Sequence, residues 1–333
     1  MREHAGRLQL SLAPLVALIL VATLSIDFLS AYIRHTEAGL GCRDWPACYG
    51  QIGESIARVE QPGIARHALA PDPLAKRAHR LLATGLVVMV LLLLHRGRQR
   101  GALAGFEAQI PLLMAALLLV RAVVWPGGSL KARPGVATCN LLGGMALAAL
   151  SWRLLLGLRR SARVVSSVRL RRLTRIALGL LVLQLALGAW VSANFAGLAC
   201  GGLLDCAAPA NAGTDSVPAA FWYFRELALD ADGRVPTTAG SVAIHVAHHA
   251  GACLAAFALL AAGVQALRER VPRHVVLPVL ALLLAQLGLG AFMVSASLPL
   301  PLVLAHSTVA ALLLLALMRL DYTLQPASAE RRS

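Results

Sequence analysis

The sequence predicts an all-α integral membrane protein in which eight transmembrane helices form two pseudo-symmetric four-helix bundles. Two observations predict the membrane helices, and an internal repeat described below predicts their division into two sets of four. The chain has 333 residues, of which 58% are hydrophobic and only 14% are charged, and its mean hydropathy is +0.70, which is too apolar for an ordinary soluble domain. The apolar residues also fall in runs of about 20, the length with which a helix crosses a bilayer.

Eight such runs follow one another along the chain. The first is longer than the apolar core of a cleavable signal peptide, so we expect it to remain as a helix. Long loops at 33–77 and 194–239 interrupt the series after the first and fifth runs. The predicted spans are 9–32, 78–95, 107–125, 134–157, 173–193, 240–264, 275–296 and 301–320.

Basic residues in the short loops predict the orientation. They gather on the side that holds both termini, and by the positive-inside rule that side is cytoplasmic. The net charge of +15 therefore reflects topology and contact with anionic membrane lipid, and we expect no nucleic-acid partner. The residues are Arg2, Arg7, Arg96, Arg98, Arg100, Arg159, Arg160, Arg163, Arg169, Arg171, Arg172, Arg175, Arg268, Arg270, Arg273, Arg331 and Arg332.

Each long outer loop contains a close pair of cysteines. Cys42 and Cys48 lie in the first loop, and Cys200 and Cys206 lie in the second. Close pairs in an oxidising compartment can form small disulfide loops, either structural or redox-active. Metal binding is the alternative, but neither pair has the two-residue spacing typical of zinc sites.

Six other side chains have ordinary structural interpretations. The two cysteines within spans are expected to be small buried apolar residues, the two loop histidines to be solvated, and the two charges near the outer ends of spans to be interfacial or paired. These are Cys139 and Cys253, His35 and His67, and Asp27 and Arg121, respectively.

An internal repeat divides the chain into residues 1–160 and 161–333. The segment Ala38–Cys42 (AGLGC) after the first span returns as Ala196–Cys200 (AGLAC) after the fifth. Ala78-His79 near the start of the second span likewise returns as Ala247-His248 near the start of the sixth. Similar offsets indicate a duplicated unit of four helices, with both copies starting from the cytoplasmic side.

Three histidines near the outer ends of spans are candidate haem ligands. Two imidazoles from facing helices of a bundle can occupy both axial positions of a haem iron. His248 and His306 form a complete pair of this kind, whereas the repeat places Asn140 where His79 would need its partner. A lone histidine is more often structural, hydrogen-bonded to a neighbouring helix. Ionisable groups inside a membrane are costly, however, and the recurrence favours ligation.

Two further histidines lie close to His248. His245 is one turn earlier and could share its helix face, so it would contact a haem propionate, contact the ligand histidine from behind, or be an alternative ligand. His249 points about 100° away, so we do not expect it to ligate the same iron.

Four segments of the sequence resemble the haem A synthases of the CtaA type, especially the proteobacterial ones. The most specific is the outer cysteine loop. The resemblance spans nearly the whole chain. The segments are 32–50 (YIRHTEAGLGCRDWPACYG), 183–194 (LQLALGAWVSAN), 243–248 (AIHVAH) and 298–306 (LPLPLVLAH).

The resemblance implies an eight-helix protein of the bacterial inner membrane, with haem b in the C-terminal half and haem O as the substrate in the N-terminal half. Oxidation of the C8 methyl group of haem O to a formyl group gives haem A for terminal oxidases. His248 and His306 would ligate the haem b iron, and His79 would ligate the haem O iron. Cys42 and Cys48 would form an outer disulfide that acts in catalysis or haem transfer. Haem O synthase and oxidase assembly factors are the implied partners.

Three positions depart from the pattern of this family. Lys76 stands where the family has a glutamate, Asn140 where it has a histidine, and His249 where it has an arginine. A glutamate one turn before His79 could accept a proton or stabilise charge, which a lysine cannot do. Glu37 or His35 could compensate. The departures leave an alternative: a non-catalytic paralogue that binds haem b and acts in electron transfer, haem handling or oxidase assembly.

Overall fold

The computed structural model describes a molecule built from helices. It covers residues 2–37, 46, 48–52, 73–99, 106–123, 133–202, 205–206 and 216–326. The elements are α1 (Arg2–Glu37), α3 (Pro73–Gln99), α4 (Phe106–Val123), α5 (Pro134–Leu158), β1 (Val164–Ser166), α6 (Val168–Ala193), α7 (Val217–Ala220), α8 (Ala239–Arg268), α9 (Arg273–Ser295), α10 (Leu300–Thr323) and β2 (Leu324–Pro326).

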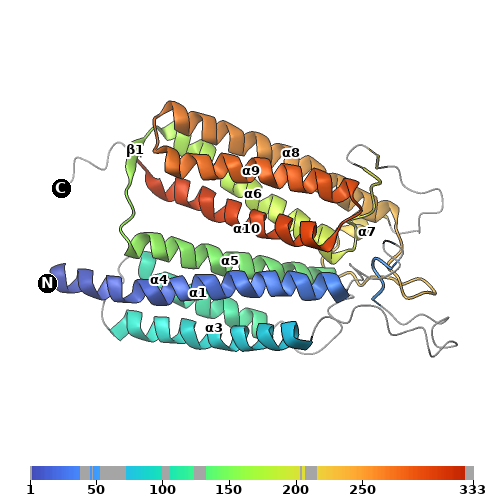
Figure 1. Ribbon diagram of the computed structural model, residues 1–333, viewed down its shortest axis with the longest axis horizontal. Helices are drawn as coiled ribbons and strands as arrows, with labels where there is room; N and C mark the ends of the chain where they lie inside the picture. The colour runs from blue at the N-terminus through green and yellow to red at the C-terminus, as the bar shows by residue number, and fades with distance from the viewer. Residues whose placement is uncertain are drawn as a thin grey trace.

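The long helices gather in two groups of four that follow the order of the chain (Figure 1). In the first group, α1 packs against α3, α3 against α4, α4 against α5, and α5 against α1. In the second group, α6 packs against α8, α8 against α9, α9 against α10, and α10 against α6. The groups meet where α1 and α5 contact α10 and where α5 contacts α6.

Seven helices in the described part of the chain are long and apolar enough to cross a membrane, which identifies a multi-pass membrane protein. They correspond to seven of the eight predicted spans. The remaining one falls on α4, whose apolar stretch among the described side chains runs only from Gln109 to Leu119. The eighth span therefore stays a prediction.

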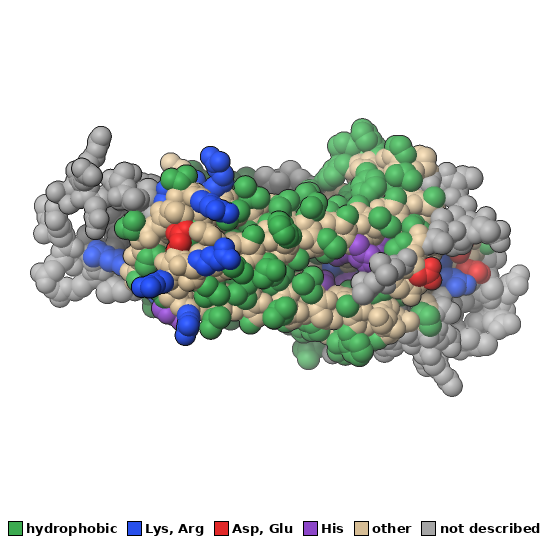
Figure 2. Space-filling view, turned by 90° about the horizontal axis from the view of Figure 1, so that it is seen from above, with side chains coloured by type: hydrophobic (Ala, Val, Ile, Leu, Met, Phe, Trp, Pro, Cys, Tyr) green, Lys and Arg blue, Asp and Glu red, His purple; other side chains and the backbone are tan. Residues whose placement is uncertain are grey.

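Arginine side chains gather at the end of the molecule where α1 begins and α10 ends (Figure 2). The helices also extend beyond the apolar runs predicted from sequence. For example, α1 continues to Glu37 and α3 begins at Pro73. Helical hydrogen bonds do not stop where the apolar residues stop, because polar side chains can continue a helix into the interface.

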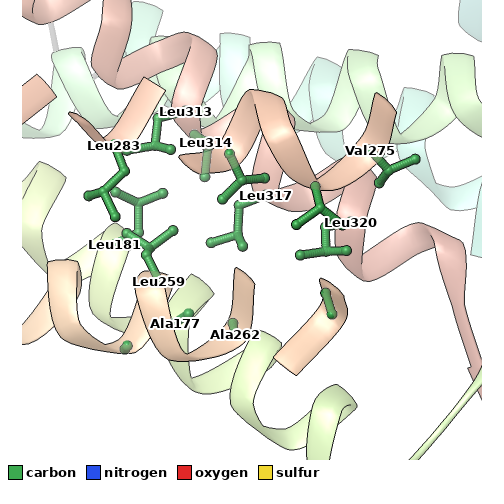
Figure 3. Close-up of a cluster of buried hydrophobic side chains, with 14 of the residues drawn as sticks. Ala177, Leu181, Leu259, Ala262, Val275, Leu283, Leu313, Leu314, Leu317 and Leu320 are labelled. Carbon is green, nitrogen blue, oxygen red and sulfur yellow. The ribbon is translucent and has the colours of Figure 1, made fainter. Parts of the chain in front are cut away.

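Each group of helices has its own apolar core. In the second group, Leu181, Leu259, Leu283, Leu313 and Leu317 point toward one another from four helices (Figure 3). Lipid tails are as apolar as leucine, so van der Waals packing, rather than escape from water, holds such helices together. The core of the first group contains Leu12, Ile19, Leu93, Ile110, Met114, Leu147 and Leu154.

At the basic end of the molecule, β1 lies in the connection between the two groups and pairs in parallel with β2, which follows α10. The side chain of Ser167 caps α6 by accepting a hydrogen bond from Leu170 N. Glu269, just after α8, accepts hydrogen bonds from Ser167 N at 2.9 Å and Ser167 Oγ at 2.5 Å. Burial raises the pKa of Glu269, but the hydrogen bonds from Ser167 and Gln265 and the charge of Arg171 outweigh it, so that the pKa lies below its usual value.

Candidate functional site

A cavity of about 1400 Å³ extends through both groups of helices. Its wall includes residues of α1, α3, α4, α5, α6, α8, α9 and α10 and is predominantly apolar. His79, Asn140, His248 and His306 all line this cavity. The structure therefore brings the four positions singled out by the repeat to one internal space.

His248 on α8 is held against α6. Gln184 Nε2 lies 3.0 Å from His248 Nδ1 and 3.4 Å from His248 Nε2, and it donates a hydrogen bond to His248 O at 3.1 Å. One turn further along α6, a Cβ at Gly188 would lie 3.0 Å from His248 Cε1. The imidazole thus rests between an amide and a glycine that leaves space for the ring.

His306 on α10 is held in the same way against α9. Gln286 Nε2 lies 3.0 Å from His306 Nε2. A Cβ at Gly290, again one turn further along the helix, would lie 3.2 Å from His306 Cε1. Both candidate ligands of the second group therefore have a glutamine and a glycine, four residues apart, as neighbours.

Sequence reasoning missed these two glutamine–glycine pairs, although a signal was present. Residues 184–189 read QLALGA and residues 286–291 read QLGLGA. A spacing of four residues puts Gln and Gly on one helix face. Searching for short repeats between α6 and α9, rather than only between the two halves, would have found them.

The remaining histidines of α8 also line the cavity. His245 is buried, and its ring centroid lies 4.5 Å from that of His249. His245 Nδ1 is buried without a hydrogen-bond partner. His245 therefore shares the cavity with His248. Figure 2 shows histidine side chains at the surface, between apolar flanks of the molecule.

The first group of helices contributes Lys76 and His79 from α3 and Asn140 from α5 to the cavity wall. Asp27 of α1, for which we expected an interfacial or paired charge, lines the cavity too and has an interaction partner. Its carboxylate lies against Gly144, where a Cβ would collide with Asp27 Oδ1. Because Gly144 is one turn beyond Asn140 on α5, a carboxylate is present on the same side of α5 as the missing histidine.

His35 and His67 were both expected to be solvated loop histidines. His35 is 9% exposed and lines the cavity, so its expected solvation is wrong. The reason is that α1 continues past the apolar run and carries His35 inward. His67 lies outside the described residues, as does the side chain of Arg121.

The outer cysteines agree in part with expectation. Cys200 and Cys206 form a disulfide. Cys48 is buried and disulfide-bonded, whereas Cys42 lies outside the described residues.

The two cysteines within spans are free and exposed, so the expectation that they are buried is wrong. Cys139 Sγ accepts a hydrogen bond from Tyr223 Oη at 3.3 Å. Cys253 lies on the cavity wall. A cysteine is apolar enough to face lipid or an apolar cavity, so its presence in a span does not fix burial between helices.

Tyr49, next to Cys48, ties the first outer loop to the second group of helices. Its hydroxyl accepts a hydrogen bond from Gly197 N at 3.2 Å, and its ring meets that of Phe195 edge-on, with centroids 6.1 Å apart. A bridge between Gln51 and Arg234 extends the contact. Burial raises the pKa of Tyr49 to about 12, although the hydrogen bond from Gly197 and the nearby charge of Arg34 oppose the shift.

The donor set fits a haem in the second group of helices. Two imidazoles line a mostly apolar cavity, and each has a glycine beside it. Buried polar atoms usually have partners, yet Gln184 Oε1, Gln286 Oε1 and His306 Nδ1 have none. An unpartnered imidazole nitrogen such as His306 Nδ1 is the kind of atom that an iron centre ligates.

Comparison with known proteins gives two matches. A family model described as COX15-CtaA, cytochrome oxidase assembly protein, matches residues 13–318. The chain is also 32% identical over 322 residues to a protein named heme A synthase from Shewanella oneidensis, covering 93% of this chain and 96% of that protein. The matched region includes all the described residues that line the cavity.

Proposed function

Because this chain belongs to the COX15-CtaA family of cytochrome oxidase assembly proteins, we propose that it is a haem A synthase. It would be an oxidoreductase that converts the C8 methyl group of haem O into the formyl group of haem A for terminal oxidases. The observation that carries the proposal is the single cavity, because it joins the place expected for a resident haem to the place expected for the substrate.

In the C-terminal half, His248 and His306 would hold the iron of haem b. Their ring atoms lie beside Gln184 and Gln286, which would orient the imidazoles. Bound there, haem b would supply one-electron redox chemistry. The apolar wall of the cavity would limit access of water to it.

In the N-terminal half, His79 would ligate the iron of haem O as substrate. Asn140 cannot replace a second imidazole well, because an amide is a weak ligand for haem iron. Haem O held through one histidine would keep an open axial position. Asp27 would be the acidic side chain closest to this part of the substrate site. It packs against Gly144, which lies one turn from Asn140 on α5.

The remaining features would serve delivery and assembly in the bacterial inner membrane. Both termini would be cytoplasmic, and the chain would comprise two related halves, residues 1–160 and 161–333. Cys42 and Cys48 would form the disulfide of the first outer loop and act in catalysis or haem transfer. Haem O synthase would deliver the substrate, and oxidase assembly factors would accept the product.

The experiment is to express the chain with a haem O synthase in a host that makes no haem A, and to separate the extracted haems by chromatography. We expect haem A or its hydroxylated intermediate. A His79→Ala variant at equal membrane abundance is the matched control and should yield neither. If the unaltered chain accumulates, binds haem b and yields only haem O, it acts as a non-catalytic haem b protein and the proposal is wrong.

A further inference from the structure

Arg34 places a guanidinium group inside the outer part of the cavity. It lies in the last turn of α1, within a helix that crosses the membrane, and its side chain lines the cavity. Its Nη1 atom is buried and has no hydrogen-bond partner. The ion pairs within the described part of the chain do not include Arg34. A cation placed in this way is costly unless an anion accompanies it.

Arg34 lies on the seam between the two groups of helices. Arg34 lines the same cavity as Tyr49, and Tyr49 is fixed to Gly197 and Phe195 just beyond the end of α6. Arg34, Lys76 and Arg80 are the cationic Lys and Arg side chains on the described cavity wall, but the other two belong to α3. Arg34 thus shares this part of the wall with Tyr49, which is anchored just beyond the end of α6, the helix whose Gln184 holds His248.

Two more unsatisfied polar atoms occur on the same wall. Ser192 Oγ and His245 Nδ1 are buried without partners, and both residues line the cavity. Ser192 lies one turn beyond Gly188 on α6, and His245 lies one turn before His248 on α8. Because Gly188 contacts His248, and because α6 ends and α8 begins at the outer end, both residues lie one turn outward from the imidazole of His248.

The acidic side chains on the described cavity wall do not provide a counter-ion for the charge of Arg34. Asp27 is the single Asp or Glu on the described part of the wall. It lies about two turns earlier on α1 and packs against Gly144 of α5. A guanidinium and a hydroxyl that face a cavity without a local carboxylate match a ligand that brings its own carboxylate.

We propose that Arg34, with Ser192 and His245, forms a carboxylate-binding site that holds a propionate of the tetrapyrrole bound between His248 and His306. This inference rests on the proposed function, because it assumes that the C-terminal half binds haem. It adds a residue of the N-terminal half to the haem site of the C-terminal half. The site therefore requires both halves to be assembled.

The test measures binding of ferric haem b and of its dimethyl ester to the full-length chain purified without haem. The ester keeps the iron and the ring but lacks both carboxylate charges. We expect Arg34→Gln to weaken binding of haem b by about 10- to 100-fold, the loss expected for a charge-assisted hydrogen bond, and to leave binding of the ester unchanged. Arg34→Lys should lose less, because it keeps the charge but not the forked geometry.

Arg153→Gln is the matched control. Its guanidinium stacks on the ring of Tyr322, 4.5 Å from the centroid, at the basic end of the molecule, and Arg153 is not part of the cavity wall. We expect equal affinities for haem b in this variant and in the unaltered chain. If Arg34→Gln does not fold, the unaltered chain still tests the proposal. A carboxylate-binding site requires that it bind haem b more tightly than the dimethyl ester, and equal affinities would contradict the proposal.

Three outcomes would overturn the inference. Equal losses for haem b and ester in Arg34→Gln would make Arg34 a structural residue. Unchanged haem b binding, with loss of stabilisation by anionic lipid vesicles, would assign Arg34 to a lipid headgroup. Failure of the unaltered chain to bind either compound would remove the haem-binding premise, and with it the proposed function. The first two outcomes leave that function intact.

Discussion

Replacing Gly188 by alanine tests whether His248 is an iron ligand. A Cβ at this position would lie 3.0 Å from His248 Cε1, 3.6 Å from Nδ1 and 3.9 Å from Nε2. Carbon atoms in contact normally lie about 3.5–4.0 Å apart, so the ring must retreat by about 0.5 Å. In the haem-free protein the end of a side chain can make this movement at little cost.

Bound haem removes that freedom, because the iron fixes the position of the ring. The overlap then costs about 1–3 kcal/mol, as overpacking does elsewhere, which corresponds to roughly 5- to 150-fold in haem affinity. Helix propensity acts in the opposite direction, since alanine is better than glycine inside a helix by about 1 kcal/mol. We therefore expect Gly188→Ala to bind haem b more weakly while the haem-free protein stays as stable as before or becomes more stable.

The assay is the haem-to-protein ratio and the low-spin absorption spectrum of the purified chain, together with thermal unfolding of the haem-free form. Gly179→Ala on the same helix is the matched control, because a Cβ there would meet no atom within 4 Å. It should gain stability and keep its haem. A Gly188→Ala variant that keeps a full complement of haem and an unchanged spectrum would refute the assignment of His248 as a ligand.

The remaining predictions concern both halves and the basic end. His248→Ala or His306→Ala should abolish the low-spin bis-histidine spectrum, and a surviving spectrum would exclude that residue as a ligand. Asn140→His should supply the missing imidazole and raise the haem content of protein loaded with haem O, as measured by chromatography of the extracted haems; an unchanged content would show that position 140 does not face the iron. Glu269→Gln should lower stability by about 0.5 kcal/mol, the low end for a hydrogen bond at a partly exposed site. Because the folded pKa of Glu269 is lowered, its contribution is present above the unfolded pKa and is lost as the pH falls through the folded pKa. The stability difference between the two proteins in thermal unfolding should therefore disappear in acid, and a difference that persists there would contradict this account.

The positions of the helices could be predicted from the sequence because the pattern that marks a membrane span is local. A run of about 20 apolar residues is a span wherever it occurs, and seven of the eight predicted runs appear as helices that could cross a membrane. The histidine pattern was equally readable, since the repeat fixes which turn of which helix each residue occupies. His79, Asn140, His248 and His306 accordingly line one cavity.

Which side of a helix faces which neighbour could not be predicted. Helices such as α5, α8 and α9 are apolar on nearly all sides, so no polar face identifies the side that turns toward lipid. For this reason Cys139 and Cys253 were expected to be buried and are exposed. The same limit hid the contact of Gln184 with His248, which depends on how α6 and α8 rotate against each other.

The sequence by itself determined that this protein lies in a membrane. It also predicted two related halves, in which three histidines and an asparagine occupy corresponding turns. Hydropathy and residue spacing carry that information, because both are read directly along the chain. Only the tertiary structure decided that Gln184 and Gln286 flank the two histidines and that Arg34 reaches the seam beside Tyr49. Those contacts join residues far apart in the chain, and packing between apolar surfaces, rather than any local pattern, selects them.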